Sequence, residues 1–195
     1  FSRIGEIRAI RLLLEMLRKR VGFPVSYASL ANDLQIAPNT VRKYMEILES
    51  LHIIFLIQPF HKNIARSLLK EPKVYFYDSG YVEGYEGIRL ENTVAVSLLK
   101  HVQYLQDAKG METSLHYIRT KDGKEVDFSL AEKGELTQFI EVKLSDDGIS
   151  RNLRYFKDRY RGVKALQLVH NARNEQEIGG ISIMRAGEWL AQLSA

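Results

Sequence analysis

The feature that most constrains the fold of this chain is a change in hydrophobic periodicity near residue 110. Before this point apolar residues recur at spacings of three and four, as in Ile7, Ile10 and Leu14, which is the pattern of an amphipathic helix. After it, short segments alternate apolar and polar residues, as half-buried strands do. The sequence therefore predicts a mostly helical N-terminal part and a C-terminal part built around a sheet.

The N-terminal part shows the patterns of a winged helix-turn-helix. Its expected elements are helices at 7–21, 25–34 and 38–51 and strands at 52–57 and 73–77. Ser26 or Ser29 is expected to cap the second helix, and Asn39 or Thr40 the third. A basic loop at 61–67 joins the two strands. Three helices followed by a strand pair with a basic loop predict a winged helix-turn-helix domain over residues 1–80.

The charge is concentrated in this part. The net charge is +4, and the first 80 residues hold 12 Lys and Arg against 7 Asp and Glu. A basic surface suits an anionic partner, so we expect nucleic acid, with DNA favoured. Arg42 and Lys43 would project from the third helix into a groove, and Lys62 and Arg66 would contact the backbone from the loop. The alternative is a winged helix that binds protein or only connects domains.

The C-terminal part, residues 81–195, is predicted to be an α/β domain. Its expected elements are helices at 90–106, 149–160 and 186–193 and strands at 115–119, 125–130, 136–144, 165–169 and 181–184. This order implies a sheet flanked by helices. Alternation within the second strand places Val126 and Phe128 on one face, with Glu125 and Asp127 on the other.

Two carboxylates and a lysine on neighbouring strands are the candidate site. Asp127 and Glu141 can converge across a sheet at roughly 5 Å. Carboxylates that close repel each other unless a cation lies between them, and Mg²⁺ or Mn²⁺ accepts such oxygens. Lys143 shares a face with Glu141 and could stabilise charge on a phosphate, while Glu91 could add a ligand or hold a metal-bound water. The alternative is a solvated strand face on which Glu141 and Lys143 form an ion pair.

This arrangement resembles the PD-(D/E)XK nuclease superfamily, whose core runs helix, three-stranded antiparallel meander, helix, strand. The resemblance implies a restriction-endonuclease-like fold in which Glu91, Asp127, Glu141 and Lys143 form the catalytic set. It also implies a metal held by Asp127, Glu141 and the carbonyl of Val142. Val126 occupies the position of the nominal proline of the motif, which is not a ligand.

Four strings in order are similar to one prokaryotic family, a domain of unknown function on the C-terminal side of AAA+ ATPases. They cover residues 73–80, 90–92, 117–128 and 140–143. The resemblance implies an ATPase domain that precedes these residues and a nuclease-like activity on phosphodiester bonds. The chain contains no G-x-x-x-x-G-K-[ST], so ATP binding is not assigned to it.

The amino-acid composition excludes several other classes of protein. The chain has no cysteine, which excludes disulfide scaffolds, thiolate zinc sites and a cysteine nucleophile. No apolar run approaches the roughly 18–20 residues of a membrane span, and we expect a cytoplasmic protein with no membrane partner. Two hypotheses stand beside the nuclease: a catalytically silent module that binds DNA or protein and targets the ATPase, and a transcription regulator that uses the winged helix alone.

Overall fold

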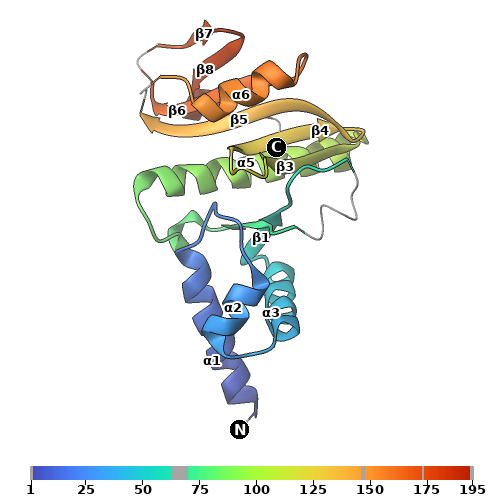
Figure 1. The fold of residues 1–195 in the computed structure, drawn as a ribbon, viewed down its shortest axis with the longest axis vertical. Helices are drawn as coiled ribbons and strands as arrows, with labels where there is room; N and C mark the ends of the chain where they lie inside the picture. The colour runs from blue at the N-terminus through green and yellow to red at the C-terminus, as the bar shows by residue number, and fades with distance from the viewer. Residues whose placement is uncertain (1, 63–69, 146–147, 173, 194–195) are drawn as a thin grey trace.

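The computed structural model describes residues 2–62, 70–145, 148–172 and 174–193, and its fold is mixed α/β (Figure 1). The N-terminal part contains α1 (Ser2–Arg18), α2 (Tyr27–Leu34), α3 (Pro38–Ser50), β1 (Ile54–Ile57) and β2 (Lys73–Phe76). The two strands pair antiparallel, with Ile54 opposite Phe76 and Ile57 opposite Lys73. The predicted elements of this part are therefore present.

The helix starts test the capping predictions. Ser26 caps α2, and its hydroxyl accepts a hydrogen bond from the backbone N–H of Ser29, as expected. The prediction for α3 is wrong, because its N-cap is Ala37, which makes no side-chain cap. Pro38 occupies the first helical position, where its fixed φ suits a helix and its missing N–H costs nothing. The helix therefore begins before the polar residues that were expected to cap it.

The C-terminal part is one six-stranded sheet with helices on both faces. Its elements in chain order are η1 (Ser79–Tyr81), α5 (Glu86–Lys109), β3 (Thr113–Arg119), β4 (Glu125–Glu132), β5 (Glu135–Ser145), α6 (Arg151–Arg159), β6 (Lys164–Asn171), β7 (Gln176–Ile178), β8 (Ile181–Arg185) and α7 (Ala186–Leu190). The strand order is β3-β4-β5-β6-β8-β7. The first three strands form an antiparallel meander, and β6 and β8 continue parallel to β5. The sequence did not predict β7, whose residues are all exposed and carry no burial pattern.

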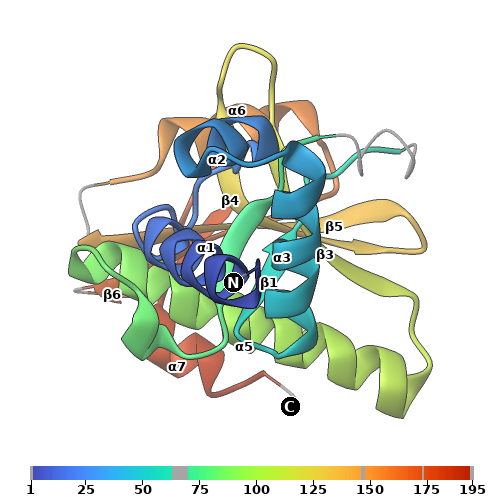
Figure 2. The same cartoon turned by 90° about the horizontal axis from the view of Figure 1, so that it is seen from below.

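Helices α5 and α6 lie on opposite faces of the sheet (Figure 1). Helix α5 contacts β3 and β5 of the sheet and also β2 of the N-terminal pair. Seen from below, α1 and α3 lie in front of parts of α5, whereas α2 lies in front of α6 (Figure 2). One apolar core runs from Leu17 through Tyr75 and Leu98 to Ile140. The division into domains at residues 1–80 and 81–195 stays a prediction, but this core crosses it.

A β-bulge in β4 overturns the predicted alternation of residues 125–130. Between β3 and β4, His116 pairs with Ser129 and Ile118 pairs with Val126, so β4 carries one extra residue. As a result Phe128 packs in the core on the α5 side, whereas Val126 joins the apolar cluster on the α6 side. The expectation that both side chains share a face is wrong. Bulges re-aim side chains, and this one lies at Asp127.

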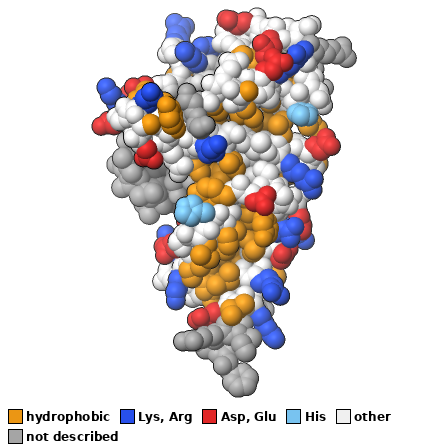
Figure 3. Space-filling model, turned by 180° about the vertical axis from the view of Figure 1, so that it is seen from behind, with side chains coloured by type: hydrophobic (Ala, Val, Ile, Leu, Met, Phe, Trp, Pro, Cys, Tyr) orange, Lys and Arg blue, Asp and Glu red, His pale blue; other side chains and the backbone are white. Residues whose placement is uncertain are grey.

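The surface of the N-terminal part carries several exposed apolar side chains. Ile7, Leu12 and Leu51 are each more than half exposed. On the face seen from behind, apolar side chains form a band over the narrow N-terminal end, with acidic and basic side chains interspersed along its edges (Figure 3). Within the described part of the chain, no helix combines the length and the apolarity of a membrane span.

Candidate functional site

Asp127 lies where β4 and β5 separate. The described ladder between the two strands ends at the pair Phe128 and Ile140. Beyond that pair the carboxylate of Asp127 takes the place of a backbone acceptor, because Oδ2 accepts the N–H of Val142 at 2.8 Å. In a paired strand the N–H and C=O of one residue face the same neighbour, so the Val142 carbonyl is directed toward Asp127 as well.

Glu141 is buried and only half satisfied. Its side chain is 4% exposed, and Oε1 accepts hydrogen bonds from the Ser150 hydroxyl at 2.9 Å and from Lys143 Nζ at 2.8 Å. Oε2 is buried with no hydrogen-bond partner. The expected Glu141–Lys143 pair is present, but the strand face around Glu141 is not solvated. A buried oxygen without a donor is costly, which makes it a candidate ligand atom.

Two polar residues hold this carboxylate in place, and sequence reasoning missed both. Ser150 caps α6 and donates its hydroxyl to Glu141. Its own N–H is bound by Gln167 Oε1 at 2.8 Å, and Gln167 Nε2 donates to the carbonyl of Gly148 at 2.9 Å. Gln167 is fully buried in β6. A glutamine inside the apolar run 165–169 was the available signal, because a buried amide needs partners.

Lys73 lies among the predicted site residues, although the sequence analysis did not include it. Its side chain is 1% exposed, and Nζ lies 2.7 Å from Glu125 Oε1, 3.7 Å from Glu91 Oε1 and 3.9 Å from Asp127 Oδ1. The ammonium thus lies among three carboxylates, one from α5 and two from β4. A lysine at the start of a fully buried strand was a usable signal, since lysine is almost never fully buried unless paired.

Glu91 joins the N-terminal part to the sheet. Its Oε1 accepts a hydrogen bond from the Tyr75 hydroxyl at 2.8 Å. Gly22, with φ of 78°, packs its backbone against the same carboxylate, and a Cβ there would lie 2.6 Å from Oε1. Only glycine fits this close approach with a positive φ. The sequence analysis included Glu91 in the candidate site, and it did not predict these contacts.

Burial and mutual repulsion raise the proton affinity of the carboxylates. Burial, and next the charge of Asp127, raise the pKa of Glu91 to about 8. The same two causes, in the same order, raise the pKa of Glu141 to about 7. For Lys73, burial favours the neutral form, but Asp127, Glu91 and Glu125 together outweigh it, so its pKa is raised and the ammonium persists.

The site offers few ligands to a metal. Among the residues that the structure describes, no three His, Asp or Glu side chains converge on a metal position. Asp127 and Glu141 supply two carboxylates, and the Val142 carbonyl is a third oxygen. This set fits Mg²⁺, which keeps several waters and is commonly bound through one or two carboxylates. Oε2 of Glu141, which has no hydrogen-bond partner, is the oxygen most available to coordinate a cation.

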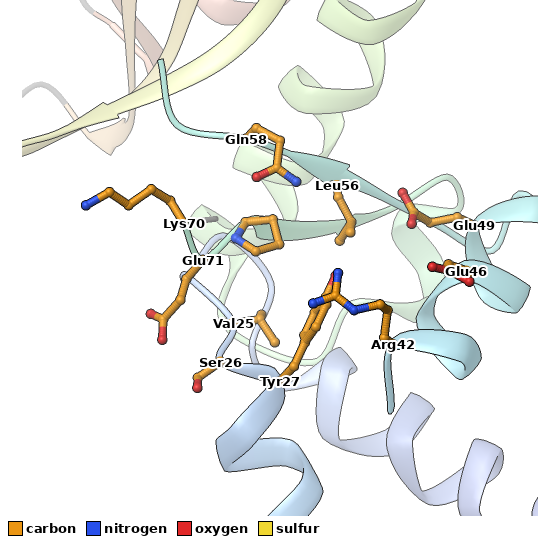
Figure 4. Close-up of a pocket in the computed structure, with 11 residues that line it drawn as sticks. Val25, Ser26, Tyr27, Arg42, Glu46, Glu49, Leu56, Gln58, Lys70 and Glu71 are labelled. Carbon is orange, nitrogen blue, oxygen red and sulfur yellow. The ribbon is translucent and has the colours of Figure 1, made fainter. Parts of the chain in front are cut away.

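The predicted nucleic-acid-binding residues that the structure describes have different surroundings. Arg42 extends over the ring of Tyr27, 5.3 Å from its centroid, and lines a cavity of about 630 Å³ together with Glu46 and Glu49 (Figure 4). Lys43 is exposed. Lys62 forms an exposed ion pair with Glu135 at 3.4 Å. Arg66 lies outside the described residues.

Two family descriptions together match nearly the whole chain. Residues 86–189 match the Domain of unknown function (DUF4143), and residues 1–91 match the Domain of unknown function (DUF8612). The first match covers more than half of the chain. The chain belongs to the DUF4143 family. The site of Glu91, Asp127, Glu141 and Lys143 therefore lies within the part that defines membership.

The curated relatives are uncharacterized proteins. One is from Mycobacterium tuberculosis and another from Mycobacterium bovis, and each is 27% identical over 145 residues. The match covers 71% of this chain and 33% of each relative, so the chain spans about a third of their length. No solved structure matches the chain.

Proposed function

We propose that this chain carries a Mg²⁺- or Mn²⁺-dependent phosphodiesterase site of the PD-(D/E)XK type that acts on nucleic acid. The observation that carries the proposal is the buried, unpartnered Oε2 of Glu141, close to Asp127 and next to Lys143. A buried carboxylate with a free oxygen beside a second carboxylate is the arrangement that a hard divalent cation satisfies. The element order α5, β3-β4-β5, α6, β6 also agrees with the core of that superfamily.

The position of each residue suggests its role in the proposed site. Asp127, Glu141 and the Val142 carbonyl would hold the cation, which would polarise a phosphoryl oxygen and lower the pKa of a bound water. Lys143 Nζ is held by Glu141 and is 44% exposed, so it can reach a substrate phosphate and stabilise developing charge. Glu91, hydrogen-bonded to Tyr75, supports the site from α5.

The wider assignment rests on the family and on the N-terminal part. DUF4143 domains are typically found with AAA ATPases, which supports an ATPase as the partner of this chain. Helices α1–α3 followed by the antiparallel pair β1–β2 agree in order with a winged helix-turn-helix. We propose that this part guides nucleic acid toward the site.

Cleavage by matched proteins tests the proposed activity. Single- and double-stranded DNA and RNA are incubated with the parent chain and Mg²⁺ or Mn²⁺, beside a Lys143→Ala variant purified identically. We expect the variant to lose about 10²–10³-fold in rate, because one electrostatic donor is removed while the cation ligands remain. Lys164→Ala, an exposed lysine on β6, is the control and should cleave like the parent. Equal cleavage by the parent and Lys143→Ala would show that the activity does not arise at this site.

A catalytically silent binding module is the second candidate. Lys73 favours it, because its ammonium already neutralises part of the acidic cluster without any metal. Absence of cleavage by the parent on every substrate, together with retained nucleic-acid binding, would select this candidate. The same assay with the ATPase domain restored would then show whether turnover depends on it.

A further inference from the structure

The position of Lys73 has a consequence for how many cations the site accepts. Its Nζ is within 4 Å of one oxygen from each of Glu91, Glu125 and Asp127. Asp127 presents its Oδ1 to Lys73 Nζ at 3.9 Å, while its Oδ2 accepts the N–H of Val142, whose carbonyl belongs to the proposed metal position. The ammonium and the proposed metal position therefore adjoin different oxygens of the same carboxylate.

The Lys73 ammonium is fixed there by its own strand. Lys73 pairs with Ile57 in the β1–β2 ladder and forms a bridge with Pro24. Its Nζ also lies over the Tyr117 ring, 5.3 Å from the centroid. The hydrogen bond to Glu125 at 2.7 Å anchors the other end of the side chain. A buried lysine held at both ends cannot swing out to solvent without breaking the β1–β2 packing.

We propose that Lys73 is a permanent second cation of this site, standing where a second divalent ion would otherwise bind. Two-metal phosphodiesterase sites hold ions about 3.5–4 Å apart that share a bridging carboxylate. Here Asp127 is the shared carboxylate, and Lys73 takes one of the two positions. The site therefore binds one divalent cation, and Lys73 is a positioning residue that holds Glu91, Glu125 and Asp127 together. This inference rests on the proposed metal site at Asp127 and Glu141.

The number of bound ions tests the proposal directly. Mn²⁺ is titrated into the chain at pH 8, and the stoichiometry is read by calorimetry and by electron paramagnetic resonance of the free ion. We expect one Mn²⁺ for the parent and two for Lys73→Met, which keeps most of the length of the side chain and removes its charge. Lys143→Ala is the matched control, since it removes the other lysine of the site, and it should bind one. A folded Lys73→Met protein that binds one Mn²⁺ would overturn the proposal.

Folding of the variant is followed in parallel by circular dichroism, because Lys73→Met leaves three partly buried carboxylates without their cation. Lys73→Met combined with Glu125→Gln removes one negative charge as well and should fold more readily, again with two Mn²⁺ bound. If neither variant folds even with Mn²⁺ present, the position does not accept a divalent ion and the proposal is wrong. No Mn²⁺ on the parent but one on Lys73→Met would overturn the metal site of the proposed function and support the role of Lys73. No Mn²⁺ on any of these proteins would overturn both.

Discussion

Ser150 links the stability of a helix to the geometry of a carboxylate. Its hydroxyl oxygen accepts the N–H of Leu153, which caps α6, and the same hydroxyl donates to Glu141 Oε1. Because Gln167 holds the Ser150 backbone, the hydroxyl is fixed in direction. The hydrogen bonds from Gln167 to Ser150 and from Ser150 to Glu141 thus orient the Glu141 carboxylate, including its unpartnered Oε2. Orientation of this kind is typical of groups that support metal ligands.

Ser150→Ala should therefore affect two properties at once. Loss of the cap is expected to lower the free energy of unfolding by about 1 kcal/mol, and loss of the hydrogen bond to Glu141 should weaken Mn²⁺ binding by about tenfold or more. Ser26→Ala is the matched control, since Ser26 caps α2 through the N–H of Ser29 and none of its hydrogen bonds described here goes to a carboxylate. It should lower stability by a similar amount and leave Mn²⁺ affinity unchanged. Denaturant unfolding and calorimetric titration measure the two properties, and equal Mn²⁺ affinity for both variants would contradict this role of Ser150.

At the scale of elements, periodicity was enough to find the helices and most strands. The alternation in β5 placed this strand within one residue of its observed bounds, because burial of one face determines both the pattern and the element. The apolar spacing found α1 but predicted 7–21, whereas the helix is Ser2–Arg18. The bulge in β4 was not predictable, since one extra residue leaves the sequence pattern intact and appears only in the pairing with β3. The partners of Lys73 were not predictable for a related reason, because they come from α5 and β4 and no local pattern brings these two elements together.

Helix α3 is the element on which the nucleic-acid prediction depends. Arg42 lies over the ring of Tyr27 beside Glu46 and Glu49, and Arg42 and Lys43 are both exposed on this helix. We expect Arg42→Ala combined with Lys43→Ala to weaken binding to duplex DNA. The slope of log K against log salt should also become shallower, by about 0.9 for each phosphate that these two side chains neutralise. Fluorescence anisotropy over a range of salt concentrations measures both the affinity and the slope.

Lys100→Ala combined with Lys109→Ala is the control for that experiment, because it removes the same charge from α5. This control should change affinity much less. If both double variants bind with the same affinity and salt slope as the parent, α3 does not contact DNA, and the N-terminal part is a connector or a protein-binding module.

At the scale of the whole molecule, the site is shared by the two parts of the chain. Lys73, Tyr75 and the backbone of Gly22 reach the carboxylates from the N-terminal part, while Glu91 and Asp127 come from the C-terminal part. Tyr75 is fully buried in the core that joins them. The free energy of unfolding of the entire chain should therefore depend on the protonation of these carboxylates.

The stability of the metal-free protein should fall as pH rises from 5.5 to 8.5. Burial raises the pKa of Glu91 to about 8 and that of Glu141 to about 7, whereas both groups titrate near 4.3 in the unfolded chain. Between these values the folded state keeps protons that the unfolded state has lost, so the free energy of unfolding decreases with pH. Each pKa unit corresponds to about 1.4 kcal/mol, and 1 kcal/mol moves Tm by roughly 2–4 °C in a chain of this size, so a fall of about 5 °C or more is expected. Thermal unfolding in the presence of a chelator measures it.

Mn²⁺ should oppose this trend, because metal binding requires the ionised carboxylates and strengthens as they lose their protons. The gain in Tm on adding Mn²⁺ is expected to be small at pH 5.5 and largest at pH 8.5. Glu91→Gln combined with Glu141→Gln is the control, since neutral amides at both positions should leave Tm nearly independent of pH in this range and insensitive to Mn²⁺. A parent protein whose metal-free Tm rises steadily from pH 5.5 to 8.5 would show that the two carboxyl groups are ionised in the folded state throughout. Lys73 and Lys143 would then be sufficient to balance the charge of the cluster, and a divalent cation would have no electrostatic deficit to fill.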